Sequence, residues 1–385
     1  MADDSHDRRI RLGMVGGGQG AFIGAVHRIA ARLDDEYELC AGALSSNAER
    51  ALASARELGL SPERSYGSFE EMATAEAARD DGIEAVAIVT PNNTHFPIAK
   101  AFLDAGIHVI CDKPMTVTVE EAEALQTAAR DAGRILAVTY NYTGYPMVRH
   151  AKAMVEHGDL GTIRVVQVQY AQDWLSEPIE ADGQKQAEWR TDPAKSGAGG
   201  SIGDIGTHAC HLASFVTGLK LEAICADLSA FVAGRRLDDN AHMLLRFSGG
   251  AKGMLWASQV AVGNENNLRL QVYGDKGGLT WQQEQPNTLS FARLGEAPQT
   301  ITRGSPAAAE STLSATRIPA GHPEGYLEAF ATIYSEVAQA IRAARDGQPQ
   351  PAGVMFPTGD DGKAGVAFVE AAVQSSAAGG AWVEL

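Results

Sequence analysis

The chain has 385 residues, of which 45% are hydrophobic and 21% charged, a composition typical of a folded protein long enough for two domains. Its 32 Lys and Arg residues against 48 Asp and Glu residues give a formal net charge of −16. This balance disfavours nucleic acids and anionic membrane surfaces as partners, because both require a basic face. Glycine is abundant, with 41 residues, many of them clustered at 16–24 and 197–206. Such clusters indicate places where the backbone approaches another group closely.

The first 140 residues alternate between strand-like and helix-like patterns. The run at 83–90 is apolar enough for a strand buried on both faces. This alternation predicts a doubly wound parallel sheet of the Rossmann type, which we place at residues 1–140. The expected strands are 10–15, 37–44, 83–90, 108–111 and 135–139, and the expected helices are a segment ending at 32, then 48–58, 94–105 and 119–131.

From residue 141 onward, strands follow one another without helices between them. This order predicts a second α/β domain, residues 141–385, built on a large and mostly antiparallel open sheet. Near the end, an amphipathic segment predicts a helix at 326–341, and we expect one more helix at 357–378. Residues 295–320 are polar and predict a long loop. The expected strands are 162–170, 223–231, 241–247, 253–258, 268–273 and 278–281.

Cysteine usage and the termini suggest the compartment. The four cysteines are widely spaced and form no CxxC pair, which disfavours a disulfide framework or a thiolate zinc site. Residues 1–9 are charged and are followed by a strand pattern rather than an apolar signal segment, and no run of about 18 apolar residues occurs. We therefore expect a cytoplasmic protein.

A glycine-rich turn lies between the first strand and the first helix. In this position, backbone N–H groups at the start of the helix can hold a pyrophosphate, and side chains would block its approach. The turn therefore predicts dinucleotide binding by Gly16, Gly18, Gln19, Gly20, Ala21, Phe22 and Ile23.

The end of the second strand bears on the choice of cofactor. NAD-binding proteins usually carry an acidic residue here, but this chain has Ser45 and Ser46. Serine can bind a ribose hydroxyl and does not repel a 2′-phosphate, and Arg50 is close in sequence. We favour NAD, with NADP as the alternative.

Two further motifs follow strands of the same sheet. Lys113, in Asp112-Lys113-Pro114, comes directly after the strand 108–111, and Thr90-Pro91-Asn92-Asn93-Thr94-His95 follows the strand 83–90. Both turns should therefore lie at the carboxyl edge of the sheet, where ligands bind in this architecture. A solvated loop lysine is the alternative interpretation of Lys113.

The second glycine cluster leads into Gly203-Asp204-Ile205-Gly206-Thr207-His208, which should open a helix. Asp204, His208 and His211 then share one helix face at i, i+4 and i+7. Three interpretations compete: a packed structural histidine, a metal site, and general acid/base catalysis. We favour catalysis, because the sequence shows no other ligand cluster and the nucleotide signals are independent of these residues.

Taken together, the glycine turn and the TPNNTH, DKP and GDIGTH motifs resemble the Gfo/Idh/MocA oxidoreductase family in type and order over the whole chain. Asp112 replaces the usual glutamate of the family. The family's Gly-x-x-His ending, here Gly24-Ala25-Val26-His27, follows a three-residue insertion.

The resemblance implies an NAD(P)-dependent enzyme that moves a hydride between a nicotinamide and a secondary alcohol of a sugar, inositol or related cyclic polyol. It implies Lys113, Asp204 and His208 as the catalytic group. It also implies pairing of subunits through the open face of the second-domain sheet, as dimers or tetramers. The further residues that we expect at the cofactor are Thr90, Pro91, Asn92, Asn93, His95, Asp112, Lys113 and Asn141.

An aromatic side chain together with Asp, Arg and His suits a polyol, because it offers a stacking face and hydroxyl partners. Arg190 has two alternatives: a surface ion pair, or a ligand for an anionic group of a sugar acid or sulfonated sugar. Trp174 and Trp189 have packing as their alternative, and we place His322 near the site of its own or a neighbouring subunit. The expected substrate contacts are Lys113, Tyr142, Asp173, Trp174, Arg190, Asp204, His208 and His322.

Other functions remain open at this point. The same residues would serve an NAD-dependent glycoside hydrolase that works by transient oxidation and elimination. A non-catalytic sugar-sensing regulator is disfavoured because Lys113 and His208 are both present. A zinc enzyme is the fourth interpretation, although we expect no metal.

Overall fold

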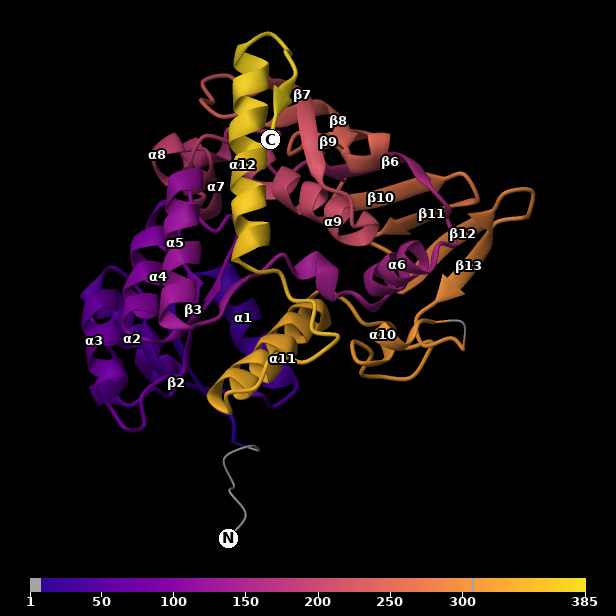
Figure 1. The fold of residues 1–385 in the computed structure, drawn as a ribbon. Helices are drawn as coiled ribbons and strands as arrows, with labels where there is room; N and C mark the ends of the chain where they lie inside the picture. The colour runs from indigo at the N-terminus through magenta and orange to yellow at the C-terminus, as the bar shows by residue number, and fades with distance from the viewer. Residues whose placement is uncertain (1–7, 307) are drawn as a thin grey trace. The chain divides into compact units, whose positions relative to one another are not determined.

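The computed structural model describes residues 8–306 and 308–385 (Figure 1). The N-terminal residues 1–7 and residue 307 of the predicted loop lie outside the described part. The chain forms two compact units. The first contains the residues up to Asn141 together with Leu327–Lys363, and the second contains Tyr142–Tyr326 together with Ala364–Leu385. We expected two contiguous domains, 1–140 and 141–385; by its packing, 327–363 instead lies with the first unit.

The first unit is built on a five-stranded sheet in which all neighbouring strands are parallel. From β1, the chain adds β2 on one side of the sheet and β3, β4 and β5 on the other. The carboxyl ends of β1 and β3, where the strand order switches sides, are therefore the expected ligand position. The expected Rossmann-type sheet is confirmed. The strands, in sheet order, are β2 (Tyr37–Ala43), β1 (Ile10–Gly16), β3 (Ala85–Val89), β4 (His108–Cys111) and β5 (Leu136–Val138).

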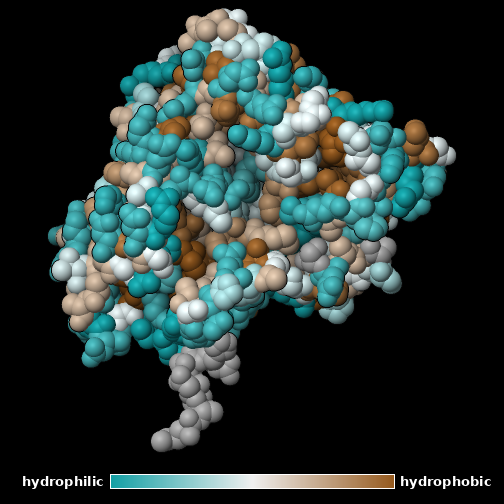
Figure 2. All heavy atoms as spheres, in the orientation of Figure 1, coloured by the Kyte–Doolittle hydropathy of each residue, from teal (hydrophilic) through white to brown (hydrophobic). Residues whose placement is uncertain are grey.

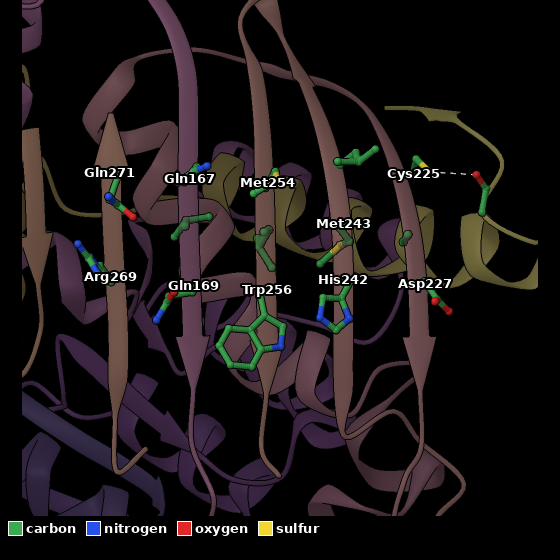
Figure 3. A pocket seen from close by; sticks show the side chains of 15 residues that line it. Gln167, Gln169, Cys225, Asp227, His242, Met243, Met254, Trp256, Arg269 and Gln271 are labelled. Atoms are coloured by element: carbon green, nitrogen blue, oxygen red, sulfur yellow. Dashed lines mark hydrogen bonds between the residues drawn. The ribbon is translucent and has the colours of Figure 1, made fainter. Parts of the chain in front are cut away.

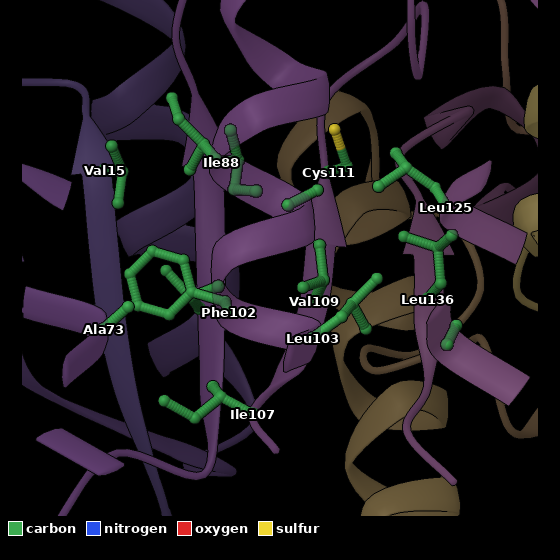
Figure 4. Close-up of a cluster of buried hydrophobic side chains, with 14 of the residues drawn as sticks. Val15, Ala73, Ile88, Phe102, Leu103, Ile107, Val109, Cys111, Leu125 and Leu136 are labelled. Atoms are coloured by element: carbon green, nitrogen blue, oxygen red, sulfur yellow. The ribbon is translucent and has the colours of Figure 1, made fainter. Parts of the chain in front are cut away.

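Helices connect these strands and cover the sheet. Val15 and Ile88 of the strands meet Phe102 and Leu125 of the helices in a shared apolar core (Figure 4). Polar side chains cover much of the outer face of α5 (Figure 2), as its amphipathic sequence requires. The helices are α1 (Phe22–Leu33), α2 (Ala48–Glu57), α3 (Phe69–Ala77), α4 (His95–Asp104), α5 (Val119–Ala132), α11 (Tyr326–Arg345) and the start of α12 (Gly359–Ala377).

Polar contacts join the late segment 327–363 to the first unit. The hydroxyl of Tyr334 lies 2.8 Å from Nδ1 of His27 in α1, and the hydroxyl of Tyr37 donates to the Tyr334 carbonyl at 2.9 Å. The amide of Val138 donates to the Pro357 carbonyl at 2.8 Å. The first unit is therefore completed only by residues that lie far along the chain.

The second unit contains a nine-stranded sheet, antiparallel except for the neighbours β6 and β9. The expected mostly antiparallel sheet is confirmed, but part of the predicted loop 295–320 is ordered as β13 and α10 (Glu310–Leu313). The strands, in sheet order, are β13 (Gln299–Thr302), β12 (Thr288–Arg293), β11 (Gly277–Gln282), β10 (Asn267–Gly274), β6 (Ile163–Ala171), β9 (Lys252–Ser258), β8 (Asn240–Phe247), β7 (Leu221–Ser229) and β14 (Val383–Glu384).

One face of this sheet packs against α6 (Pro146–His157) and α9 (Thr207–Thr217) (Figure 1). At the centre of the sheet, side chains of the opposite face line an open hollow in the part of the chain that the structure describes. Side chains alternate between the two faces, so that His242, Met254 and Trp256 point to the open side (Figure 3). Leu244 lines the same hollow and is exposed. Two short helices, α7 (Lys185–Arg190) and α8 (Pro193–Ser196), precede the second glycine cluster. In the described residues, no helix is both long and apolar enough to cross a membrane.

Candidate functional site

Close packing explains two glycines of the first turn, and backbone conformation explains a third. A Cβ on Gly24 would lie 2.3 Å from Cα of Gly17, so these glycines let α1 pack against the turn. A Cβ on Gly20 would meet no other described atom within 4 Å, but the φ of this residue, +75°, is one that other residues rarely adopt. The Gly17–Gly24 contact thus packs α1 against the turn, and the backbone at Gly20 favours glycine.

Helix α2 holds this extension in place. The amide of Gln19 donates to Oγ of Ser54 at 3.0 Å, and the Ser54 hydroxyl donates to the Arg50 carbonyl at 2.7 Å. The amide of Gly18 donates to the Leu44 carbonyl at 3.1 Å. Because the Gly18 and Gln19 amides bind protein acceptors, they are poorly placed to hold a pyrophosphate, which was the role we expected of them.

The residues that follow fit an anionic ligand better. Helix α1 begins at Phe22, and its N-cap residue, Ala21, has no side chain that could satisfy the first helical amides. The first turn carries no acidic residue, and the Phe22 side chain is 66% exposed. The helix dipole and the uncapped amides favour a phosphate at this end.

The end of β2 is neutral and accessible. Oγ of Ser45 accepts from the Asn47 amide at 3.1 Å, and Asn47 caps α2 by accepting from the Arg50 amide at 2.9 Å. Ser46 and Arg50 are exposed. This arrangement leaves room for either a ribose hydroxyl or a 2′-phosphate.

The TPNNTH and DKP turns are tied together by His95. Its Nδ1 lies 2.8 Å from the Pro114 carbonyl and its Nε2 lies 2.8 Å from the Thr90 carbonyl. The ring is buried, and burial lowers its pKa. Both ring nitrogens contact backbone oxygens, so His95 braces the two turns, whereas we expected it to contact the cofactor.

Asp112 shapes the turn that presents Lys113. Its Oδ1 accepts from the Lys113 amide at 2.8 Å and from the Thr139 hydroxyl at 3.1 Å, and the Lys113–Pro114 peptide bond is cis. In this role the carboxylate anchors the backbone of the turn. A glutamate is one methylene longer, so its carboxylate would lie at a different distance from this backbone. Pro91, Asn92 and Asn93 follow β3 in the 3₁₀ turn Asn92–Thr94, at the same sheet edge as expected.

Asn141 ends the N-terminal segment of the first unit. It is buried, and its Nδ2 has no hydrogen-bond acceptor among the described residues. A buried amide nitrogen in this state suits a ligand with an acceptor group, such as the cofactor we expect there.

In the second unit, Asp204 lies in a short π-helical turn, Ile202–Gly206, that leads into α9. Its Oδ2 accepts from Nε of Arg190 at 3.1 Å and from Nε2 of Gln259 at 2.8 Å. The guanidinium of Arg190 lies 4.2 Å from the ring centre of Trp189 and 5.9 Å from that of Trp174. Asp204 is therefore part of an ion pair, which was one of the alternatives for Arg190.

His208 is buried in a cluster of aromatic rings. The ring centre of Tyr142 is 4.9 Å away in an edge-to-face arrangement, and that of Tyr170 is 6.3 Å away. The two tyrosine hydroxyls share a short hydrogen bond, and Tyr170 also donates to Oδ1 of Asn266 at 2.8 Å. Burial raises the pKa of Tyr142 to about 12, with a smaller contribution from the Asp204 charge. Tyr142 thus fixes the imidazole ring, although we expected it to contact the substrate.

Other expected residues lie in different surroundings. Oδ2 of Asp173 accepts from the Gly263 amide at 2.9 Å, and His211 packs against Phe215 in α9. His322 is exposed on a loop whose carbonyls bind the buried Arg303, next to the edge strand β13. Asp204, in contrast, contacts Gln259 at the end of the central strand β9, so the second unit does not bring His322 beside it.

Contact residues that were not anticipated include Ser54, Tyr170 and Gln259. Tyr170 ends a recognised strand next to the expected Gln172-Asp173-Trp174, which was a usable signal. Ser54 and Gln259 carry no local signal, because each contacts a segment 35 or 55 residues away.

Comparison with known proteins identifies the family of the chain. Residues 10–140 match the NAD-binding Rossmann fold of an oxidoreductase family, and residues 148–280 match the GFO/IDH/MocA C-terminal domain. The chain belongs to the GFO/IDH/MocA family. It is 37% identical over 379 residues to the uncharacterized oxidoreductase YfiI of Bacillus subtilis, covering 97% of this chain and 96% of that protein.

Two solved structures of the family cover 98% of this chain. An oxidoreductase from Sinorhizobium meliloti is 55% identical with a TM-score of 0.89, over 99% of its own length. An inositol dehydrogenase homolog from Azotobacter vinelandii, complexed with NADH and myo-inositol, is 38% identical with a TM-score of 0.93, over 98% of its own length. The protein is therefore an oxidoreductase of this family that uses NAD(P).

The site residues of this GFO/IDH/MocA member fit that cofactor. The amides at the start of α1 would hold the pyrophosphate, and the neutral end of β2 would hold the adenosine ribose. Within the residues that the structure describes, no group of three or more His, Cys, Asp and Glu side chains is arranged to bind a metal ion.

Proposed function

We propose that this protein is an NAD(P)-dependent dehydrogenase that oxidises a secondary alcohol of an inositol, a sugar or a related cyclic polyol to the ketone. The proposed catalytic group is Lys113, Asp204 and His208, as the family resemblance implies. The oxidation releases one hydride from the carbon and one proton from the oxygen. The chemistry that a bound nicotinamide supplies is acceptance of the hydride.

The side chains of the protein deal with the proton and the developing charge. A neutral imidazole suits proton acceptance near pH 7, so His208 takes the hydroxyl proton through a ring nitrogen. The ammonium of Lys113 stabilises alkoxide character on the same oxygen. The carboxylate of Asp204 offsets the positive charge that His208 gains.

The observation that carries this proposal is the setting of His208 in the second unit. Its ring is held by Tyr142 at 4.9 Å, and the Asp204 charge is near enough to affect Tyr142. A buried, oriented imidazole one helical turn after an anchored carboxylate supports the role of general base over that of a packing residue. The Azotobacter relative, whose structure holds myo-inositol and NADH, supports a cyclic polyol as the substrate.

The test is an absorbance assay of NADH or NADPH formation with inositols and sugars, each cofactor being supplied separately. Lys113→Ala should lower kcat/KM by about 100-fold or more, the usual loss when one electrostatic partner of the reacting oxygen is removed. The matched control is Lys100→Ala, which removes an exposed lysine paired with Asp104 at 2.7 Å in the same unit. A Lys113→Ala enzyme with normal activity would contradict the assignment.

The same assay separates the hydrolytic alternative. A glycoside hydrolase of this kind would cleave glycosides with no net NADH, because the cofactor is reduced and reoxidised within one turnover. Steady accumulation of NADH with a free polyol is the expected result.

We also propose that the open face of the large sheet binds a second copy of the chain. Met254 and Trp256 lie at its centre among polar side chains such as Gln167 and Gln169 (Figure 3). Leu244 lines the same hollow, and Leu244 and Met254 are large apolar side chains left exposed on a face that solvent would otherwise cover. The family resemblance implies pairing of subunits through this face, in dimers or tetramers.

A further inference from the structure

Arg190 is a cation among the expected substrate contacts of the second unit, and its surroundings show how its charge is used. Its Nε donates to Oδ2 of Asp204 at 3.1 Å, and its Nη1 donates to Oε1 of Gln186 at 2.6 Å. The guanidinium lies 4.2 Å from the ring centre of Trp189. Nη1 also donates to the Gln186 carbonyl at 3.4 Å, and an arginine held by an indole and by these hydrogen bonds has a fixed orientation.

The carboxylate of Asp204 accepts hydrogen bonds from both Arg190 and the side-chain amide of Gln259. Nε2 of the buried Gln259 donates to the same Oδ2 at 2.8 Å. The three residues come from three separate segments: the end of α7, the π-helical turn before α9, and the position after β9. A carboxylate held by two side chains from other segments is fixed in place.

The ion pair is largely enclosed. The side chains of Arg190 and Asp204 are 23% and 14% exposed. Enclosure strengthens the attraction between the two charges relative to an exposed pair. At a third group nearby, the electrostatic effects of the two opposite charges largely offset each other. An anionic group brought to Arg190 would also approach the Asp204 carboxylate and be repelled by it.

Resting on the proposed function, we infer that Arg190 is a positioning residue that acts through Asp204, and that the substrate group received beside this pair is uncharged. The protein would therefore take neutral polyols, and sugar acids or sulfonated sugars would be poor substrates. This inference replaces the anion-binding role that the sequence left open for Arg190.

A double-mutant cycle tests the first part. We expect Arg190→Gln to lower kcat by about 10- to 100-fold while the KM for NAD changes by less than about threefold. If Arg190 acts only through Asp204, the variant Arg190→Gln/Asp204→Asn should be within about threefold of Asp204→Asn alone. Multiplying effects would show that Arg190 contacts the substrate directly and would overturn the inference.

Two variants separate positioning from a purely structural role. Arg190→Lys keeps the positive charge and should recover part of the lost kcat. The control Arg236→Gln removes an arginine of the same unit that pairs with Asp192 at 2.8 Å and is 65% exposed, and it should leave kcat unchanged. A kcat in Arg190→Lys as low as in Arg190→Gln would count against positioning by charge.

The substrate part is tested by comparing a neutral polyol with the corresponding uronic acid. We expect kcat/KM for the acid to be at least about tenfold lower. A preference for the acid that is lost in Arg190→Gln would overturn the inference. If the wild-type protein forms no NADH with any compound, the proposed function is wrong. In that case the double-mutant cycle is measured by the melting temperature, Tm. The Tm of the double variant should fall by no more than the larger fall seen in a single variant, and additive decreases in Tm would overturn the positioning role.

Discussion

Removal of one hydroxyl should weaken cofactor binding without touching the cofactor. Ser54→Ala removes the acceptor of the Gln19 amide, at 3.0 Å, and the donor to the Arg50 carbonyl, at 2.7 Å. The Arg50 carbonyl keeps its place in α2, so most of the loss falls on the Gln19 amide in the glycine turn. Gln19 is exposed and its hydrogen bond is partly buried, so the loss of the acceptor costs about 0.5–1.5 kcal/mol.

Part of that cost will be relieved by water, so we expect about 0.5–1 kcal/mol to appear in binding. This corresponds to a Kd for NADH raised by roughly 2- to 5-fold. Fluorescence titration of NADH measures this Kd directly, and steady-state assays should show a raised KM for NAD with kcat changed by less than about twofold.

The matched control is Ser65→Ala. Its hydroxyl also donates to a carbonyl four residues earlier, that of Ser61, at 2.9 Å, but it does not contact the glycine turn. NADH binding by Ser54→Ala that equals the wild type, or an equal weakening in Ser65→Ala, would refute the idea that α2 holds the turn in its binding shape.

Two other results are expected. Burial lowers the pKa of His27 to about 4; the unfolded chain therefore takes up more protons below pH 6.5, and the free energy of unfolding should fall by about 2.5 kcal/mol between pH 7 and 4.5 on account of this group. His27→Gln should flatten that decrease in chemical denaturation, whereas His157→Gln, at a side chain that is 83% exposed, should not, and an unchanged decrease in His27→Gln would contradict the assignment. Light scattering should show a dimer or tetramer for the wild type and a smaller species for Met254→Lys, because a charge at the centre of the open sheet face opposes its burial; a monomeric wild type would disprove the interface.

Much of the fold could be predicted, because the signals that define it are local. The glycine turn at 16–20 and the apolar run at 83–90 identified the parallel sheet, and the succession of strands after residue 141 identified the antiparallel one. The short edge strand Gln299–Thr302 was missed because it is polar and mostly exposed, so it lacks the alternation of a half-buried strand.

The partners of correctly predicted elements were harder to foresee. The periodicity of 326–341 predicted an amphipathic helix, but nothing in it shows that Tyr334 meets His27, some 307 residues earlier. Likewise, Asp204 and Arg190 were both singled out as site residues, yet their pairing depends on a turn that only the structure shows. Spacing along the chain predicts elements, whereas contacts between distant segments depend on how those elements pack.

The discontinuity of the first unit affects how the protein is made. Its sheet can begin to form once Asn141 has been synthesised, but His27 and Tyr37 wait for Tyr334, and Val138 waits for Pro357. The 222 residues from Tyr142 to Lys363 must be translated in between. At about 5–20 residues per second this takes roughly 10–45 s. During that interval the nascent nucleotide-binding unit has an uncovered apolar surface, which makes it a natural client for a ribosome-associated chaperone.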